Sequence, residues 1–144
     1  MDPISIITIV GAAGSLAFKC GMVIHTLYEL MEKHKHAEIS IMSIIQECRT
    51  IELAWSRIGR WAANGLDDYD DDQLSERLQL SLYSGQLVMT ELEKDLTSFL
   101  GKSQHSKFRR KAKIVWSERM LQDHQNRLRG QVCAMILLLD VIQL

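Results

Sequence analysis

The chain has 144 residues, of which 47% are hydrophobic and 24% are charged; this composition fits one packed domain and excludes a disordered chain. Its 17 basic and 18 acidic residues leave a net charge of -1, so there is no overall attraction to nucleic acid and any basic surface must be local. A single proline, Pro3, and 6% aromatic residues favour long helices over a β-rich fold.

The first predicted helix starts after Asp2, which can cap it, and runs to about His34. Residues 3–18 carry no charge, and Lys19 is the first charged residue after them. This uncharged run is shorter than the ~18–20 residues of a usual transmembrane helix, so it could span a bilayer only with Lys19 near its middle. The alternative is a helix buried in the core of a bundle. A cleaved secretory signal is not expected, because no basic segment precedes the apolar run.

Small residues recur at spacings of three and four along this helix and are predicted to share a face: Gly11, Gly14, Ala17 and Gly21. The apolar residues that flank them are Ile4, Ile7, Val10 and Phe18. Glycine within a helix costs ~1 kcal/mol relative to alanine, so several on one face predict the close approach of another backbone. That backbone belongs either to a neighbouring helix or to a second copy. The candidate residues for membrane insertion and oligomerisation are Ile4, Ile7, Gly11, Gly14, Ala17, Phe18 and Gly21.

Two further amphipathic helices are predicted over residues 37–62 and 71–100. The first ends before Asn64-Gly65, a strong turn signal. The second has a bundle seam that alternates spacings of four and three, made of Leu78, Leu82, Gly85, Met89, Leu92, Leu96 and Phe99. With a fourth helix that continues to the C-terminus, the pattern predicts an all-α fold: one domain, 1–144, built as an antiparallel four-helix bundle.

The segment 102–113 is basic, and no acidic residue occurs between Asp95 and Glu118. Such a run attracts anionic lipid by ~1 kcal/mol per cation near the surface. The candidate lipid contacts are Lys107, Arg109, Arg110, Lys111 and Lys113. The alternative is a solvated connection and helix start. Nucleic acid is not an expected partner, because the segment lacks interleaved aromatic residues and a recognition motif.

The fourth helix has a seam that includes Leu121, Leu128 and Met135, but its last third, residues 132–144, is apolar on nearly every side. A helix with one buried stripe does not need that composition. This end is therefore predicted to be buried in the bundle, or to pair with a second chain or with further protein.

No motif of an enzyme is present: there is no phosphate-binding glycine loop, zinc-protease helix or nucleophile elbow. His105 and His124 stand alone in the sequence, and Cys20, Cys48 and Cys133 are too far apart for a metal or redox pair. The three cysteines are expected to be reduced, buried thiols of a cytosolic protein. We therefore expect no enzyme activity, no catalytic or metal site and no cofactor.

The order of motifs resembles a known family. The opening Met-Asp-Pro, the following Ser5-Ile6 and the Gly-Ala-Ala-Gly-Ser stretch at 11–15 come first. A basic run then leads to Trp116, and Leu-Arg-Gly-Gln at 128–131 precedes an aliphatic tail. In this order the chain resembles the fungal HeLo-like domains, which form the N-terminal part of many fungal NLR-type (STAND) receptors.

The resemblance implies a helical bundle similar to HeLo domains and to the executioner domain of animal necroptosis. It implies a role in programmed cell death, innate immunity or heterokaryon incompatibility, with the N-terminal helix acting as a glycine zipper that targets or permeabilises the plasma membrane. The domain would be cytoplasmic at rest and would reach the plasma membrane on activation. The implied partners are further copies of the domain, anionic lipid and the sensor module of a parent receptor. The alternative is a soluble dimerisation or autoinhibitory domain of such a receptor; the 144 residues are either an excised domain or a short separate protein.

Overall fold

The computed structural model describes residues 3–64, 72–101 and 107–142 of the chain. Side chains are described at 4–64, 73–98 and 118–142. Within these ranges the structure contains four long helices that pack against one another and no strand, so the predicted all-α helical bundle is confirmed. The elements are α1 (Pro3–Lys33), the 3-10 turn η1 (Lys35–Ala37), α2 (Glu38–Ala63), α3 (Asp72–Gly101) and α4 (Lys107–Ile142).

The helix ends lie close to those expected from the sequence. At the end of α1 the His34 amide donates to the carbonyl of Leu30 at 2.9 Å, and η1 then turns the chain into α2. The Asn64 amide closes α2 by donating to the carbonyl of Arg60 at 3.1 Å. The clearest difference is at α4: the basic segment 102–113 was expected to precede the fourth helix, whereas α4 begins at Lys107, within that segment. The basic residues 107–113 are therefore the first turns of a helix rather than part of a connection.

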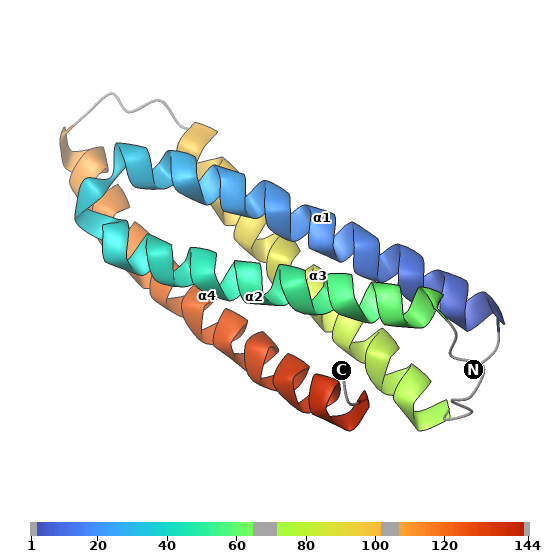
Figure 1. Cartoon of the computed structure of the whole chain (residues 1–144). Coiled ribbons are helices and arrows are strands. Elements are labelled where there is room, and N and C mark those ends of the chain that lie inside the picture. Colours follow the sequence, from blue (N-terminus) through green and yellow to red (C-terminus); the bar gives the residue numbers. More distant parts are fainter. Residues whose placement is uncertain (1–2, 65–71, 102–106, 143–144) are drawn as a thin grey trace.

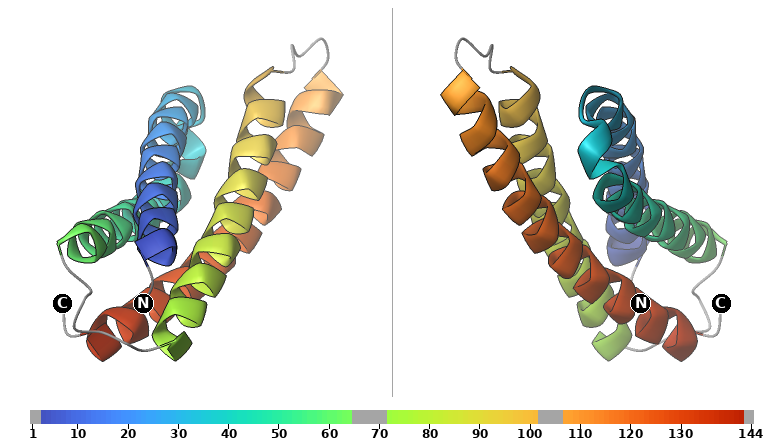
Figure 2. Two further views of the ribbon diagram at one scale, coloured as in Figure 1. Left: turned by 90° about the vertical axis from the view of Figure 1, so that its right-hand side faces the viewer. Right: turned by 90° about the vertical axis from the view of Figure 1, so that its left-hand side faces the viewer.

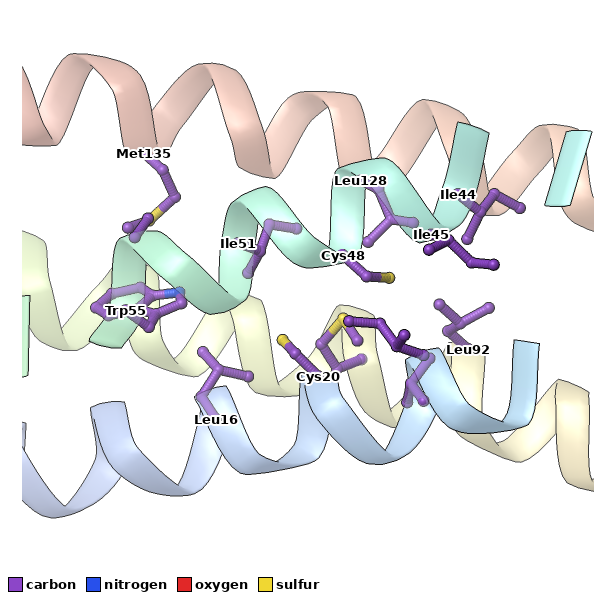
Figure 3. Packing of buried hydrophobic residues seen from close by; sticks show 14 of the residues in the cluster. Leu16, Cys20, Ile44, Ile45, Cys48, Ile51, Trp55, Leu92, Leu128 and Met135 are labelled. Carbon is purple, nitrogen blue, oxygen red and sulfur yellow. The ribbon is translucent and has the colours of Figure 1, made fainter. Parts of the chain in front are cut away.

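The four helices form two layers (Figures 1 and 2). The helix α1 packs chiefly on α2, while α3 lies beside α1 and α4 lies beside α2. The core between them is aliphatic, with the fully buried Trp55 as its largest side chain (Figure 3). The helix α1 contributes a stripe at helical spacing that includes Ile9, Leu16, Val23 and Leu27. The core thus joins all four helices, and α1 forms one side of it.

One glycine outside α1, Gly85 of α3, allows two helices to approach closely. A Cβ atom at Gly85 of α3 would lie 2.8 Å from Cδ2 of Leu16 on α1, which is closer than real Cβ contacts. At Gly59 of α2, by contrast, an added Cβ atom would lie 3.5 Å from Cβ of Ala13, which is ordinary van der Waals contact, so glycine is not required there. The buried stripe of α1 therefore meets α3 at a position where only glycine fits without a shift of the leucine.

Candidate functional site

The helix α1 has a second apolar face, directed away from the core. Its large side chains are mostly exposed: Ile4 by 77%, Ile7 by 71%, Phe18 by 73% and Met22 by 53%. Gly11 and Gly14 are exposed between them. We call this set the α1 outer face: Ile4, Ile7, Gly11, Gly14, Phe18 and Met22. The expectation of a buried core helix is therefore correct for one side of α1 and wrong for the other.

The structure separates the residues that the sequence placed together for insertion and oligomerisation. Ile4, Ile7, Gly11, Gly14 and Phe18 lie on the α1 outer face. The other two lie at its margin. Ala17 is partly buried against the core, and a Cβ atom at Gly21 would lie 3.1 Å from Oε2 of Glu52 on α2.

The two outer glycines have no neighbour in the described part of the chain. A Cβ atom added at Gly11 or at Gly14 would meet nothing within 4 Å. The sequence left two explanations for these glycines: close approach by a neighbouring helix of the same chain, or by a second copy. The first explanation is wrong at Gly11 and Gly14 as far as the described helices are concerned. The helix-propensity cost of ~1 kcal/mol each is not offset by packing inside the molecule.

The charge at Lys19 does not interrupt the α1 outer face. Because successive residues turn by about 100° around a helix, Lys19 projects to the side of Phe18. There its Nζ donates a hydrogen bond to Oγ1 of Thr90 on α3 at 2.7 Å. The first ionisable side chains that follow on the outer side are His25 and Glu29, an exposed pair in which Nε2 and Oε1 lie 3.3 Å apart. The face from Ile4 to Met22 is therefore free of charge over about 27 Å of helix.

The second group of candidate residues lies at the other end of the bundle. The start of α4, which carries Lys107, Arg109, Arg110, Lys111 and Lys113, lies at the same end of the bundle as the C-terminal end of α1, whereas α1 begins at the opposite end (Figures 1 and 2). The side chains of 107–117 lie outside the described residues. The fold thus does not bring the basic run beside Ile4 and Ile7.

The cysteines divide into two kinds. Cys20 and Cys48 are free thiols buried between α1 and α2 (Figure 3). Burial, assisted by the nearby carboxylate of Glu52, raises the pKa of Cys20 to about 12. Burial also raises the pKa of Cys48, with Cys20 and the neighbouring carboxylates adding to the shift. Cys133 is exposed on α4, so the expectation of three buried thiols is wrong at this residue.

His124, which stands alone in the sequence, has a partner in the fold. Its ring is 1% exposed, and its Nε2 lies 2.8 Å from Oδ2 of Asp95 on α3. The other ring nitrogen, Nδ1, has no hydrogen-bond partner. No nucleophile completes this pair in the part of the chain that the structure describes, and no group of three or more potential metal ligands occurs there. The pair links α3 to α4.

No family model, curated protein or solved structure matches the chain. Among the described helices, α1 is the one that is long and apolar enough to cross a membrane, with a mean hydropathy of 1.8 in its most apolar window. The core helix of a soluble protein passes the same test, and α1 also packs in the core. Besides this hydropathy, α1 has the α1 outer face, which carries no charged residue from Ile4 to Met22.

Proposed function

We propose that the chain is a non-enzymatic HeLo-like domain that signals in innate immunity or induces cell death by oligomerising at a membrane through the α1 outer face. It would be cytoplasmic at rest and would reach the plasma membrane on activation by the sensor module of a fungal NLR-type receptor. The observation that carries the proposal is the charge-free apolar surface of α1, in which Ile4, Ile7 and Phe18 are each more than 70% exposed.

The exposure of these side chains favours transfer to a lipid surface. Fully burying one large apolar side chain contributes about 1.5–3 kcal/mol. With four large side chains that are more than half exposed, burial of the α1 outer face would contribute on the order of 4–8 kcal/mol. Soluble monomers rarely leave a large continuous apolar surface open unless it binds something. The glycines between these side chains would leave room for a second helix to pack closely on α1 once the α1 outer face lies in the membrane.

A vesicle leakage assay tests this proposal. We expect the chain to release dye from phosphatidylserine-containing vesicles, and Phe18→Glu to lose release because a carboxylate then enters the apolar face. The matched control is Leu87→Glu, which adds the same charge at a side chain of α3 that is 50% exposed. Equal release by the two variants would contradict the role of the α1 outer face.

A second substitution separates oligomerisation from lipid binding. Gly14→Leu enlarges the apolar surface and meets nothing within 4 Å of the new Cβ atom, so the variant should remain folded. If a second helix packs over Gly14, the variant binds vesicles but loses leakage. Wild-type leakage by a folded Gly14→Leu protein would rule out close helix packing, because a leucine there would hold the two backbones apart.

The basic start of α4 supplies the electrostatic part of the proposal. Cations near an anionic surface add ~1 kcal/mol each, and physiological salt screens them over ~8 Å. Reversing the charge of Lys107, Arg109 and Arg110 should therefore weaken co-sedimentation with phosphatidylserine vesicles, more at low salt than at high salt. Equal binding by both proteins at both salt concentrations would assign the membrane contact to α1 alone.

The alternative function is a soluble dimerisation or autoinhibitory domain of the same type of receptor. The open space over Gly11 and Gly14 favours it, because a helix of another protein would fit there as well as lipid. Stable dimers that Phe18→Glu dissociates, together with no affinity for vesicles, would support this function against the first.

A further inference from the structure

We propose that the C-terminal half of α4 and the start of α3 form a second self-association surface, which binds the same surface of a second copy of this chain with the two α4 helices parallel. This inference goes beyond the proposed function, because the surface belongs to other helices than α1 and its pairing requires no lipid.

The helix α4 has an outer apolar face near its end. Leu137 is 67% exposed and Val141 is 66% exposed, and Cys133 and Ala134 beside them are also exposed. With Gly130, where an added Cβ atom would meet nothing within 4 Å, they form a stripe at spacings of three and four. We call this set the α4 outer face: Gly130, Cys133, Ala134, Leu137 and Val141.

A different stripe of α4 already serves the core. Leu128, Met135 and Ile142 are buried, with at most 4% of their surface exposed, and they point away from the α4 outer face. One buried stripe is enough for a helix at the edge of a bundle. A second stripe with a similar repeat is typical of a helix that packs on both sides, as in coiled coils.

The α4 outer face continues into a groove. The groove has a volume of about 430 Å³ and runs between the end of α4 and the start of α3. Leu74, Leu137, Leu138 and Val141 provide apolar lining, and Arg77 of α3 lies at its side. A ridge of large side chains such as Leu137 and Val141 beside an apolar groove is the shape that a second copy can complement.

The charges on the two sides of Leu137 favour a second copy as the occupant. Arg77 borders the groove on one side, while Asp140 projects about 60° around the helix to the other side. Neither residue forms an ion pair within the described part of the chain. An anionic lipid surface would repel Asp140, and hydrocarbon would desolvate it, so lipid is a poor occupant.

The same two charges select the parallel arrangement. A two-fold axis parallel to α4 places the Arg77 side of one copy against the Asp140 side of the other, so each copy gains an opposite charge. An antiparallel pair would place like sides together, with Asp140 of one copy facing the other Asp140. Charge complementarity of this kind sets orientation and partner choice between helices.

Sedimentation analysis of the full chain without lipid tests the surface. We expect a reversible dimer whose dissociation constant rises about tenfold or more in Leu137→Glu. The matched control is Leu53→Glu on α2, a side chain that is 55% exposed, which should dimerise like the wild type. A chain that stays monomeric at all concentrations, or equal dimerisation by both variants, would overturn the inference.

The parallel orientation has a separate test. Arg77→Asp and Asp140→Arg should each weaken the dimer, and the double variant should restore it, because each copy again presents opposite charges. Failure of the double variant to restore dimerisation would overturn the parallel arrangement.

This surface and the α1 outer face can be distinguished by experiment. Phe18→Glu should leave the lipid-free dimer intact, and Leu137→Glu should leave vesicle binding intact. If Phe18→Glu dissociates the dimer and Leu137→Glu does not, self-association belongs to α1 and the inference fails while the proposed function stands.

Discussion

Replacing single glycines by alanine should have different effects on the stability of this bundle, depending on the helix. At Gly14 of α1 the new Cβ atom enters open space, since nothing lies within 4 Å. At Gly85 of α3 it would lie 2.8 Å from Cδ2 of Leu16, a side chain with 0% exposure. The two substitutions add the same methyl group to the interior of a helix, and they differ only in what that group meets.

The magnitudes follow from two contributions. Alanine stabilises a helix interior by roughly 0.5–1 kcal/mol relative to glycine, and this contribution applies to both sites. Overpacking a core by one carbon costs typically ~1–3 kcal/mol, and this applies only at Gly85, where Leu16 must shift. We therefore expect Gly14→Ala to raise the free energy of unfolding and Gly85→Ala to leave it unchanged or lower it. The helix contribution cancels in the difference, which leaves about 1–3 kcal/mol between the two variants.

Urea unfolding followed by circular dichroism measures this difference directly. Thermal unfolding provides a second measurement, with about 2–4 °C expected per kcal/mol for a chain of this size. Gly11→Ala serves as a second open-site control, since its Cβ atom also meets nothing within 4 Å. Equal changes at Gly14 and Gly85 would refute the close contact between α1 and α3. A loss of stability in Gly14→Ala would show that the α1 outer face is covered in solution.

Two further predictions concern the polar groups and thiols of the core. Asp95→Ala should lower the free energy of unfolding by about 1–3 kcal/mol, because the ring of His124 is buried and would lose its only hydrogen bond. Denaturant unfolding measures this loss, and an unchanged midpoint would contradict the prediction. The second prediction is that iodoacetamide at pH 8 modifies Cys133 rapidly and leaves Cys20 and Cys48 unmodified until the chain unfolds. Burial raises the pKa of Cys20 to about 12 and also raises the pKa of Cys48, so both stay protonated thiols, which react slowly. Mass spectrometry of the labelled protein gives the order, and early labelling of Cys20 would show that α1 separates from α2 in the native state.

The part of the fold that could be predicted is the part in which a helix has one apolar stripe. In α3 the seam at spacings of four and three identified Leu78, Met89 and Leu96 as core residues, and all three are buried. Most residues on the other sides of that helix are polar, and the apolar ones, Leu80, Tyr83 and Leu87, are too few to outweigh the seam as the buried side. The ends of the helices were also predictable, because turn signals such as Asn64-Gly65 are local.

The candidate site was predictable only in part, because α1 is apolar on two sides. The stripe Gly11, Gly14, Ala17 and Gly21 covers a wide arc around the helix, and its pattern does not show which half faces the core. The structure places Ala17 against the core and Gly14 in the open. Periodicity cannot settle this choice, because the identity of the buried side depends on where α2 and α3 pack.

Long-range contacts were not predictable for a related reason. Thr90 lies 71 residues from Lys19, and Asp95 lies 29 residues from His124, so no local spacing indicates either hydrogen bond. The sideways projection of Lys19 is different, because it follows from the rotation of about 100° per residue relative to Phe18. That rotation alone indicates that the charge lies off the α1 outer face, without any knowledge of the fold.

The two ways in which α1 could engage a bilayer make different demands on the core. Spanning requires α1 to leave α2, which exposes apolar groups of α2 such as Ile51 and places Lys19 in hydrocarbon at a cost of about 2.5–3.5 kcal/mol or more. Lying in the interface with only the α1 outer face immersed keeps the buried stripe and the bond from Lys19 to Thr90 in place. The buried thiols report which of the two occurs, because Cys20 and Cys48 stay protected in the second mode and become reactive in the first. The charge-free outer side of α1 and the packed inner side therefore favour engagement in the plane of the membrane as the first step.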